Sequence, residues 1–265
     1  MHYVPQRAPS WNRCKGVNDT LPLWQRAAGL VAPLWHWLWA PPRCAACDVA
    51  LDRRAAFCSP CAEAVIRPQE REEVVGLDGF AAFGEFGVPL AEAIRRLKYE
   101  GRTDLAPTLG ALLRGARDQL LHPVEVVLPV PLFPVRLAER GFNQSALLAR
   151  PVLRGHGWRY RPGWLRRCRE TKPQAGLSRA ARRENLQGGV FVASHAVAGR
   201  SVLLIDDVVT TGATLRACAD ALRGSGAQRV QALVLARRGT ASAAVDVDRG
   251  PTSSPWLMEA WLEGR

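Results

Sequence analysis

The sequence predicts an α/β protein with a doubly wound, mainly parallel sheet flanked by helices. Short apolar runs at 124–130, 201–205 and 230–236 have the character of buried parallel strands. Segments with helical spacing of apolar residues alternate with these runs, which indicates βαβ units. A length of 265 residues leaves room for one sizeable domain of this kind and a small additional module.

The other expected elements follow from the spacing of apolar residues and from the positions of glycines. Residues 77–86 are typical of a strand or hairpin, and 189–193 of a short strand. Helices are expected in four segments where apolar residues recur at helical intervals. These segments are 89–98, 108–121, 144–153 and 215–224.

Four regions are expected along the chain. They are an irregular start with a Trp-rich helix (1–40), a cysteine module (41–70), the α/β domain (76–239) and a tail (240–265). The apolar part of 21–40 is shorter than the roughly 20 residues a transmembrane helix needs. That helix either packs on the body of the protein or lies in a membrane interface. The start has no secretory pattern, so a cytoplasmic protein without a transmembrane segment is expected.

The charge of the chain points to phosphate-bearing partners. The formal net charge is +12 and the isoelectric point is near 10.2, whereas the charged fraction of 23% is ordinary. A chain with this much positive charge is expected to bind nucleic acid, an anionic membrane surface or a polyphosphate substrate. Charge alone does not choose among them.

Four of the seven cysteines form two C-x-x-C pairs. Two such knuckles supply the thiolates of a closed tetrahedral Zn²⁺ site. A small module with few apolar residues needs a stabilising element such as a bound metal in order to fold. A redox dithiol is the competing interpretation. The expected ligands of a structural zinc ion are Cys44, Cys47, Cys58 and Cys61.

A threonine-rich turn follows the strand expected at 201–205. The turn can present backbone N–H groups, and the helix after it adds the positive end of its dipole, which together suit a phosphate dianion. Gly212 allows the backbone to come close. The expected phosphate-binding residues are Thr210, Thr211, Gly212, Ala213 and Thr214.

Two acids, Asp206 and Asp207, stand between that strand and the turn. Carboxylates repel a phosphate at contact range, so these two are expected to face something else. Ionised carboxylates accept hydrogen bonds, which suits the vicinal hydroxyls of a ribose. Mg²⁺ also fits, because it prefers oxygen ligands and substrate phosphates.

The run LLIDDVVTTGATL at 203–215 resembles very closely the 5-phosphoribosyl-1-pyrophosphate motif of type I phosphoribosyltransferases. The likeness extends further, and roughly 41–238 resembles the ComF family, which includes ComF of competence and DNA uptake and GntX of gluconate use. The segments that carry it are 41–44, 97–102, 130–132 with Arg136, 140–145 and 169–185. The resemblance implies a type I phosphoribosyltransferase-like sheet with an N-terminal zinc-ribbon-like module.

The resemblance also implies roles for individual residues. Asp206 and Asp207 would bind the ribose hydroxyls and help place Mg²⁺, and the turn would hold the 5-phosphate. Pyrophosphate would be held by Arg136, Arg140, Asn143 and, more weakly, Lys98. Lys98 and its neighbour Arg102 could equally be a solvated helix end, where cations favour the dipole.

Three functions remain open from the sequence. The first is a Mg²⁺-dependent phosphoribosyltransferase of unknown acceptor, linked to DNA uptake and to competence proteins. The second is a non-catalytic protein that binds single-stranded DNA or nucleotides in natural transformation. The third, an accessory of carbon metabolism, follows from the GntX resemblance alone.

Basic residues are concentrated in the stretch 150–183, where Glu170 is the one acid that opposes them. Its cations are interleaved with Trp158, Tyr160 and Trp164, a pattern that could form a groove for single-stranded nucleic acid. It could also be a flap whose cations serve pyrophosphate. The two interpretations are compatible.

Overall fold

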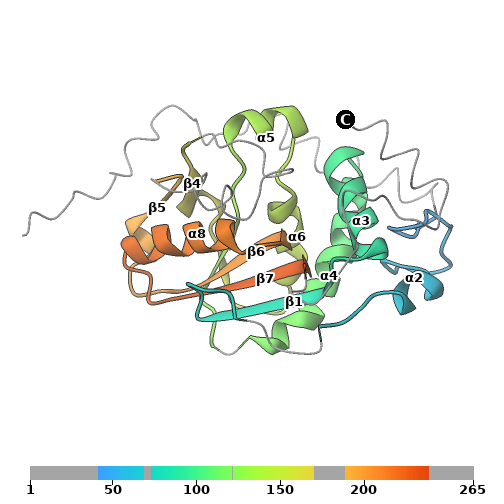
Figure 1. Cartoon of the computed structure of the whole chain (residues 1–265), viewed down its shortest axis with the longest axis horizontal. Coiled ribbons are helices and arrows are strands. Elements are labelled where there is room, and N and C mark those ends of the chain that lie inside the picture. The colour runs from blue at the N-terminus through green and yellow to red at the C-terminus, as the bar shows by residue number, and fades with distance from the viewer. Residues whose placement is uncertain (1–40, 69–72, 121, 170–188, 239–265) are drawn as a thin grey trace, which may run out of the picture.

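The computed structural model describes residues 41–68, 73–120, 122–169 and 189–238 (Figure 1). The expected Trp-rich helix, the tail after residue 239 and much of the expected flap lie outside the described residues. Within the described part of the chain, no helix is long and apolar enough to cross a membrane.

A parallel sheet of five strands forms the centre of the molecule, in the order β1-β7-β6-β2-β3. Each neighbouring pair in it runs parallel, which confirms the predicted sheet. Its strands are β1 (Gly79–Glu85), β2 (Val126–Pro129), β3 (Arg159–Tyr160), β6 (Ser201–Val209) and β7 (Arg229–Arg237).

Strand β6 lies between β7 and β2 and is longer than predicted. The sequence places its end at Ile205, but pairing with β7 continues until Val209 faces Arg237. Asp206 therefore lies inside the sheet, opposite Val234. The acids do not end the strand, because the backbone hydrogen bonds of the β6–β7 ladder extend past them.

Helices cover both faces of the sheet (Figure 1). One face carries α3 (Val88–Tyr99), α4 (Ala106–Ala116) and α6 (Gln144–Val152), and the other carries α8 (Ala213–Gly224). Alternate residues of β6 enter the two cores: Leu203 and Ile205 on the α3 side, Val202 and Leu204 on the α8 side. This alternation is the period of two that a strand imposes.

Most of the short elements were not predicted; of those given below, only β5 was expected, as a strand at 189–193. Strand β5 begins later than expected and pairs antiparallel with β4 in a separate sheet of two strands. The short elements are α2 (Ser59–Glu63), α5 (Pro134–Arg140), β4 (Leu165–Arg167), β5 (Phe191–Ala193), η2 (Thr103–Leu105), η3 (Arg117–Gln119), η4 (Pro162–Trp164) and η5 (His195–Val197).

The cysteine module shares a core with the α/β domain. Cys44 and Phe57 belong to the same buried cluster as Ile94 and Leu97 of α3. The carbonyl of Ile66 also accepts a hydrogen bond from the Glu85 amide of β1 at 2.8 Å. The module is therefore fixed to the domain by packing and by backbone contacts.

The close approach of α4 and α6 generates a stability prediction. A Cβ added at Gly110 would lie 2.7 Å from both the Leu148 carbonyl oxygen and Pro151 Cγ, so Gly110→Ala must push the helices apart. We expect it to lower the free energy of unfolding by about 1–3 kcal/mol, measured by urea denaturation. Gly115→Ala is the matched control in the same helix, because nothing lies within 4 Å of its added Cβ. The control is expected to be neutral or stabilising, by up to about 1 kcal/mol. Equal effects of the two changes would contradict the packing argument.

Candidate functional site

The two acids of β6 are buried beside α6. Asp206 is 8% exposed and Asp207 is 3% exposed. The Ser145 hydroxyl donates to Asp206 Oδ1 at 2.8 Å, and the Asp207 amide donates to the same oxygen at 3.0 Å. Ser145 holds this position because it stands in the first turn of α6, which packs against β6.

Asp207 forms an ion pair with Lys98 near the end of α3. Gln144 Nε2 also donates to Asp207 Oδ1, at 3.4 Å. The Lys98 side chain is 20% exposed, so the expectation of a freely solvated helix end is wrong for this residue. Three elements, α3, α6 and β6, thus converge on one carboxylate pair.

The environment drives the pKa values of the two carboxyls apart. Burial, together with the neighbouring Asp207 charge, raises the pKa of Asp206 to about 8. Burial also opposes ionisation of Asp207, but the Lys98 ammonium outweighs it and lowers the Asp207 pKa. The pKa of Lys98 is raised by Asp207 in spite of its own burial. The Lys98–Asp207 ion pair therefore favours a charged Asp207, whereas Asp206 ionises less readily than an exposed carboxyl.

A second layer of polar contacts supports these groups. Arg140 Nη1 donates to Gln144 Oε1 at 2.6 Å, which connects Arg140 through Gln144 to Asp207. Asn143 caps α6, since its Oδ1 accepts from the Ser145 amide at 3.0 Å. Its Nδ2 donates to the Val130 carbonyl at the same distance. Asn143 thus fixes the start of α6 against the end of β2.

The threonine-rich turn connects β6 to α8 as the sequence predicts. Gly212 has a φ of 71° and caps α8, and a Cβ there would lie 2.7 Å from Val74 Cγ1. Thr210 and Thr211 are exposed, and the Thr211 hydroxyl accepts from the Ala213 amide at 3.4 Å. The first amides of a helix have no partner within it, so this turn has the donors that an anion requires.

Two of the expected cations point elsewhere. Arg136 is exposed on α5 and pairs with Glu139 at 3.3 Å. Arg102 bonds to Asp104 at 2.9 Å and to Asp48 of the cysteine module at 3.1 Å. Of the expected cations, Lys98 contacts Asp207 directly, and Arg140 is connected to Asp207 through Gln144.

Gln144 and Ser145 contact the two acids, although the sequence did not single them out as site residues. Both lie in the run 140–145 that carries the family resemblance, immediately after Asn143. A helix at 144–153 was predicted, so the position of both residues in its first turn could be predicted from the sequence. Their contact with Asp206 and Asp207 could not, because it depends on how α6 packs on β6.

The four cysteines of the module come together as the spacing predicts. Their Sγ atoms all lie within 4.8 Å of one another. Thiolates 2.3 Å from a tetrahedral zinc ion would be roughly 3.8 Å apart, so the cluster fits such a metal with little movement. Burial opposes ionisation of Cys44, but backbone hydrogen bonds from Cys47, Cys58 and Ala46 lower its pKa to about 7.

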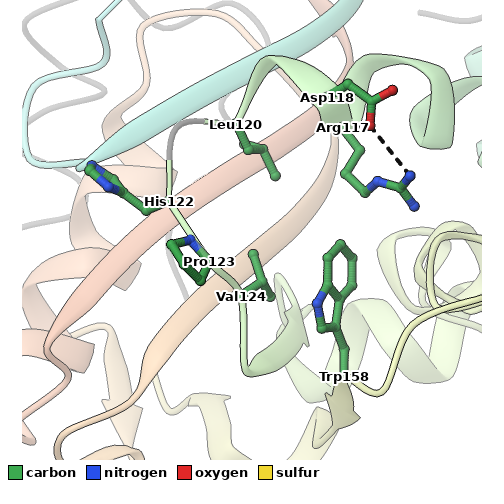
Figure 2. A pocket seen from close by; sticks show the side chains of 7 residues that line it. All are labelled: Arg117, Asp118, Leu120, His122, Pro123, Val124 and Trp158. Carbon is green, nitrogen blue, oxygen red and sulfur yellow. Dashed lines mark hydrogen bonds and ion pairs between the residues drawn. The ribbon is translucent and has the colours of Figure 1, made fainter.

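A separate pocket lies at the amino end of β2 (Figure 2). His156 stacks on the Trp158 ring with centroids 4.2 Å apart, and the Arg117 guanidinium lies 5.8 Å from that ring. This aromatic and basic group is far in the fold from the acids, which lie toward the carboxyl end of β6. The pocket has a volume of about 330 Å³ and is lined by Arg117, Asp118, Leu120, His122, Pro123, Val124 and Trp158.

Comparison with known proteins identifies the domain and its relatives. Residues 170–256 match the family described as phosphoribosyl transferase domain. Competence protein F of Haemophilus influenzae is 32% identical over 206 residues, 74% of this chain and 85% of that protein. DNA utilization protein YhgH of Escherichia coli K12 is 33% identical over 183 residues, 67% of this chain and 78% of that protein. Competence protein ComFC of Streptococcus pneumoniae is 29% identical over 166 residues, 63% of this chain and 71% of that protein.

A solved structure, the glutamine phosphoribosylpyrophosphate amidotransferase from B. subtilis, is also similar. It is 20% identical, with a TM-score of 0.32, over 52% of this chain and 30% of that chain, and so distant a likeness carries no argument. The domain match and the relatives confirm the resemblance seen in the sequence. The chain belongs to the ComF family of competence proteins and contains a phosphoribosyltransferase domain.

Proposed function

We propose that this protein binds 5-phosphoribosyl-1-pyrophosphate together with Mg²⁺ and transfers its phosphoribosyl group in a process of DNA uptake. The observation that carries the proposal is that three elements of the site follow one another directly in the chain. A strand with two acids runs into a turn with a left-handed glycine and then into a helix of 12 residues. The domain match and the relatives' names as competence and DNA utilization proteins support it.

Each part of the ligand has a matching group. The turn from Thr210 to Thr214 would receive the 5-phosphate on its amides and hydroxyls. Asp206 and Asp207 would accept hydrogen bonds from the ribose hydroxyls, and Mg²⁺ held there would neutralise charge on the pyrophosphate. Lys98 and Arg140, the cations nearest the acids, would hold the leaving group.

The transfer needs little covalent chemistry from the protein. A nitrogen of the acceptor forms a bond to the anomeric carbon, and the bond from that carbon to the pyrophosphate oxygen breaks. The electron pair leaves with pyrophosphate, and the nitrogen loses its proton to solvent. The chain's contribution is positioning and stabilisation of the negative charge that develops on the leaving group.

We further propose that the cysteine module holds a structural zinc ion. The four Sγ atoms are close enough, and each cysteine offers one sulfur to the ion. The ion would join the two knuckles, and the module would then present Asp48 to Arg96 and Arg102 of the α/β domain.

Single-stranded DNA is a second candidate ligand, favoured by one specific observation. Guanidinium groups lie beside tryptophans of the described part of the basic stretch. Arg161 is paired with Trp164, and Arg117 of η3 with Trp158, both at 5.8 Å. Rings can stack on bases while cations follow the backbone. The exposed Arg154 and Arg159 extend this surface.

The acid pair generates the first functional prediction. The isosteric double change Asp206→Asn with Asp207→Asn removes the charge that ribose hydroxyls and Mg²⁺ require. We expect the affinity for 5-phosphoribosyl-1-pyrophosphate in Mg²⁺, measured by calorimetry, to fall by about 100-fold or more. Asp220→Asn, an exposed acid on α8, is the control and should bind normally. Unchanged affinity in the double variant would remove these acids from the site.

Metal analysis tests the zinc proposal. Cys58→Ser should lose the zinc ion found in the parent protein and should unfold at a lower temperature, because binding of a structural metal contributes to folding. Cys218→Ser, a buried cysteine outside the cluster, should keep its zinc. A parent protein purified without chelator and free of zinc would refute the assignment.

Salt dependence tests the DNA candidate. Binding of a single-stranded oligonucleotide should weaken steeply with salt, and each lost phosphate contact should reduce the slope of log affinity against log salt by about 0.7. Arg154→Glu with Arg159→Glu should therefore flatten the slope. Arg53→Glu with Arg54→Glu makes the same change in net charge on the cysteine module and should have the smaller effect. Equal effects would indicate attraction by net charge alone.

A further inference from the structure

One residue of the cysteine module has a backbone conformation that ordinarily favours glycine. Asp48 directly follows Cys47 and has a φ of 61°, and among the residues that the structure describes it is the one non-glycine residue with a positive φ. Its amide donates to the Cys44 carbonyl at 3.0 Å, so this conformation closes the first knuckle. Aspartate tolerates the left-handed region better than most residues, but glycine adopts it without steric cost. Closure of the knuckle therefore does not explain why an aspartate stands here.

The Asp48 carboxylate contacts the α/β domain. Its Oδ1 lies 3.2 Å from Arg96 Nη1 and accepts a hydrogen bond from Arg102 Nη1 at 3.1 Å. The side chains of Arg96 and Arg102 are 15% and 29% exposed. Because both guanidinium groups are largely shielded from water, these contacts lose less to solvent than ion pairs on an open surface. One carboxylate oxygen of the module thus binds two cations of the domain.

These two arginines stand at the two ends of the turn that contains Lys98. Arg96 lies in the last turn of α3, and Arg102 is the residue just before η2. The amides of Glu100 and Arg102 both donate to the Arg96 carbonyl at 3.2 Å, which closes the turn. Lys98, which pairs with Asp207, lies between the two arginines in the chain. Asp48 therefore holds both ends of the segment that presents Lys98 to the acids.

Neutralisation of the arginines does not require the module. Arg96 bonds to Glu92 of its own helix at 2.9 Å, and Arg102 bonds to Asp104 at 2.9 Å. Each guanidinium thus has a carboxylate partner within the α/β domain. What Asp48 adds is a connection between the two arginines, and between both of them and the first knuckle. Its contribution is therefore to position the turn rather than to compensate charge.

We propose that Asp48 is a positioning residue through which the metal state of the cysteine module sets the affinity of the sugar-pyrophosphate site. When the four cysteines hold zinc, the knuckle keeps the Asp48 carboxylate on Arg96 and Arg102, and Lys98 is fixed where it can bind the leaving group. When the knuckles are not joined, the carboxylate is released and Lys98 binds pyrophosphate less well. The inference rests on the proposed sugar-phosphate site and on the proposed zinc ion. By linkage, the sugar pyrophosphate must strengthen zinc binding by the same factor.

The test measures this linkage on the zinc-loaded full chain. The apparent zinc affinity is determined by competition with a zinc-selective chelator in Mg²⁺, with and without 5-phosphoribosyl-1-pyrophosphate. In the parent protein the ligand should raise the zinc affinity by about 5-fold or more, the lower end of typical coupling between two sites. Asp48→Gly suits the left-handed backbone and removes the carboxylate, so it should keep its zinc, but the ligand should no longer change the zinc affinity. Calorimetry should show that zinc-loaded Asp48→Gly binds the ligand about 5-fold more weakly than the parent protein.

Three further variants separate positioning from folding. Asp52→Gly makes the same substitution at an exposed acid of the same module and should keep the coupling. Arg102→Gln removes one partner of Asp48 from the other side and should weaken the coupling. In an Asp48→Gly background it should change ligand affinity little, because both changes break the same contact. Should Asp48→Gly lose its zinc, Asp48→Asn keeps the shape of the side chain without its charge, and together with Arg102→Gln it decides the question.

The outcomes distinguish this inference from the proposals beneath it. A ligand that raises zinc affinity equally in the parent protein and in zinc-loaded Asp48→Gly would overturn the role of Asp48. A parent protein that binds both zinc and ligand, with no effect of one on the other, would overturn the coupling while both underlying proposals stand. A parent protein that binds zinc but not 5-phosphoribosyl-1-pyrophosphate would overturn the proposed function, and this inference with it.

Discussion

The buried ion pair between Lys98 and Asp207 is the interaction on which the site depends. Two adjacent acids in the centre of a sheet are costly, since a buried charge without a partner destabilises a protein by several kcal/mol. The fold offsets this cost in two ways: Lys98 neutralises Asp207, and the raised pKa of Asp206 disfavours a second charge beside it. Hydrogen bonds from α6 reach one oxygen of each carboxyl. The position of α3 is therefore set by charge as well as by its apolar face.

The same helix connects the cysteine module to the site. Asp48, in the first knuckle, has a φ of 61° and pairs with Arg96 at 3.2 Å and Arg102 at 3.1 Å. Arg96 also bonds to the buried Glu92 at 2.9 Å, so its guanidinium is fixed from both sides. Lys98 follows two residues later. A metal that orders the knuckle would thus stabilise the part of α3 that presents Lys98, which gives a module remote from the acids a physical reason to be kept.

The sequence predicted those parts of the candidate site that are contiguous in the chain. It did not predict the contacts that depend on how helices pack on the sheet. Strand β6, the turn and α8 could be predicted because their signals follow one another directly in the sequence. These signals are an apolar run, then threonines and a glycine, then apolar residues at helical spacing. The end of β6 was misplaced because two acids ordinarily mark a strand end, and only the ladder with β7 carries them further. Strands β3 and β4 were missed because two or three residues amid arginines give no apolar run. The sequence left open whether Lys98 is a site residue or a solvated helix end. Its partner Asp207 is 109 positions away, and only the packing of α3 on the sheet brings the two together.

The acids and the pocket beside Trp158 lie at opposite ends of the sheet. The acids and the turn lie toward the carboxyl end of β6, where parallel sheets place their ligands. The pocket with Trp158 and Arg117 adjoins Val124, just before β2 begins at Val126. Asn143 binds the Val130 carbonyl at the other end of the same strand. The two sites therefore share no side chain, and a protein that bound nucleic acid at one end could still bind a sugar phosphate at the other. Because β2 contributes to both ends, coupling between them would have to act through the rigid sheet, so the simplest expectation is two independent binding events.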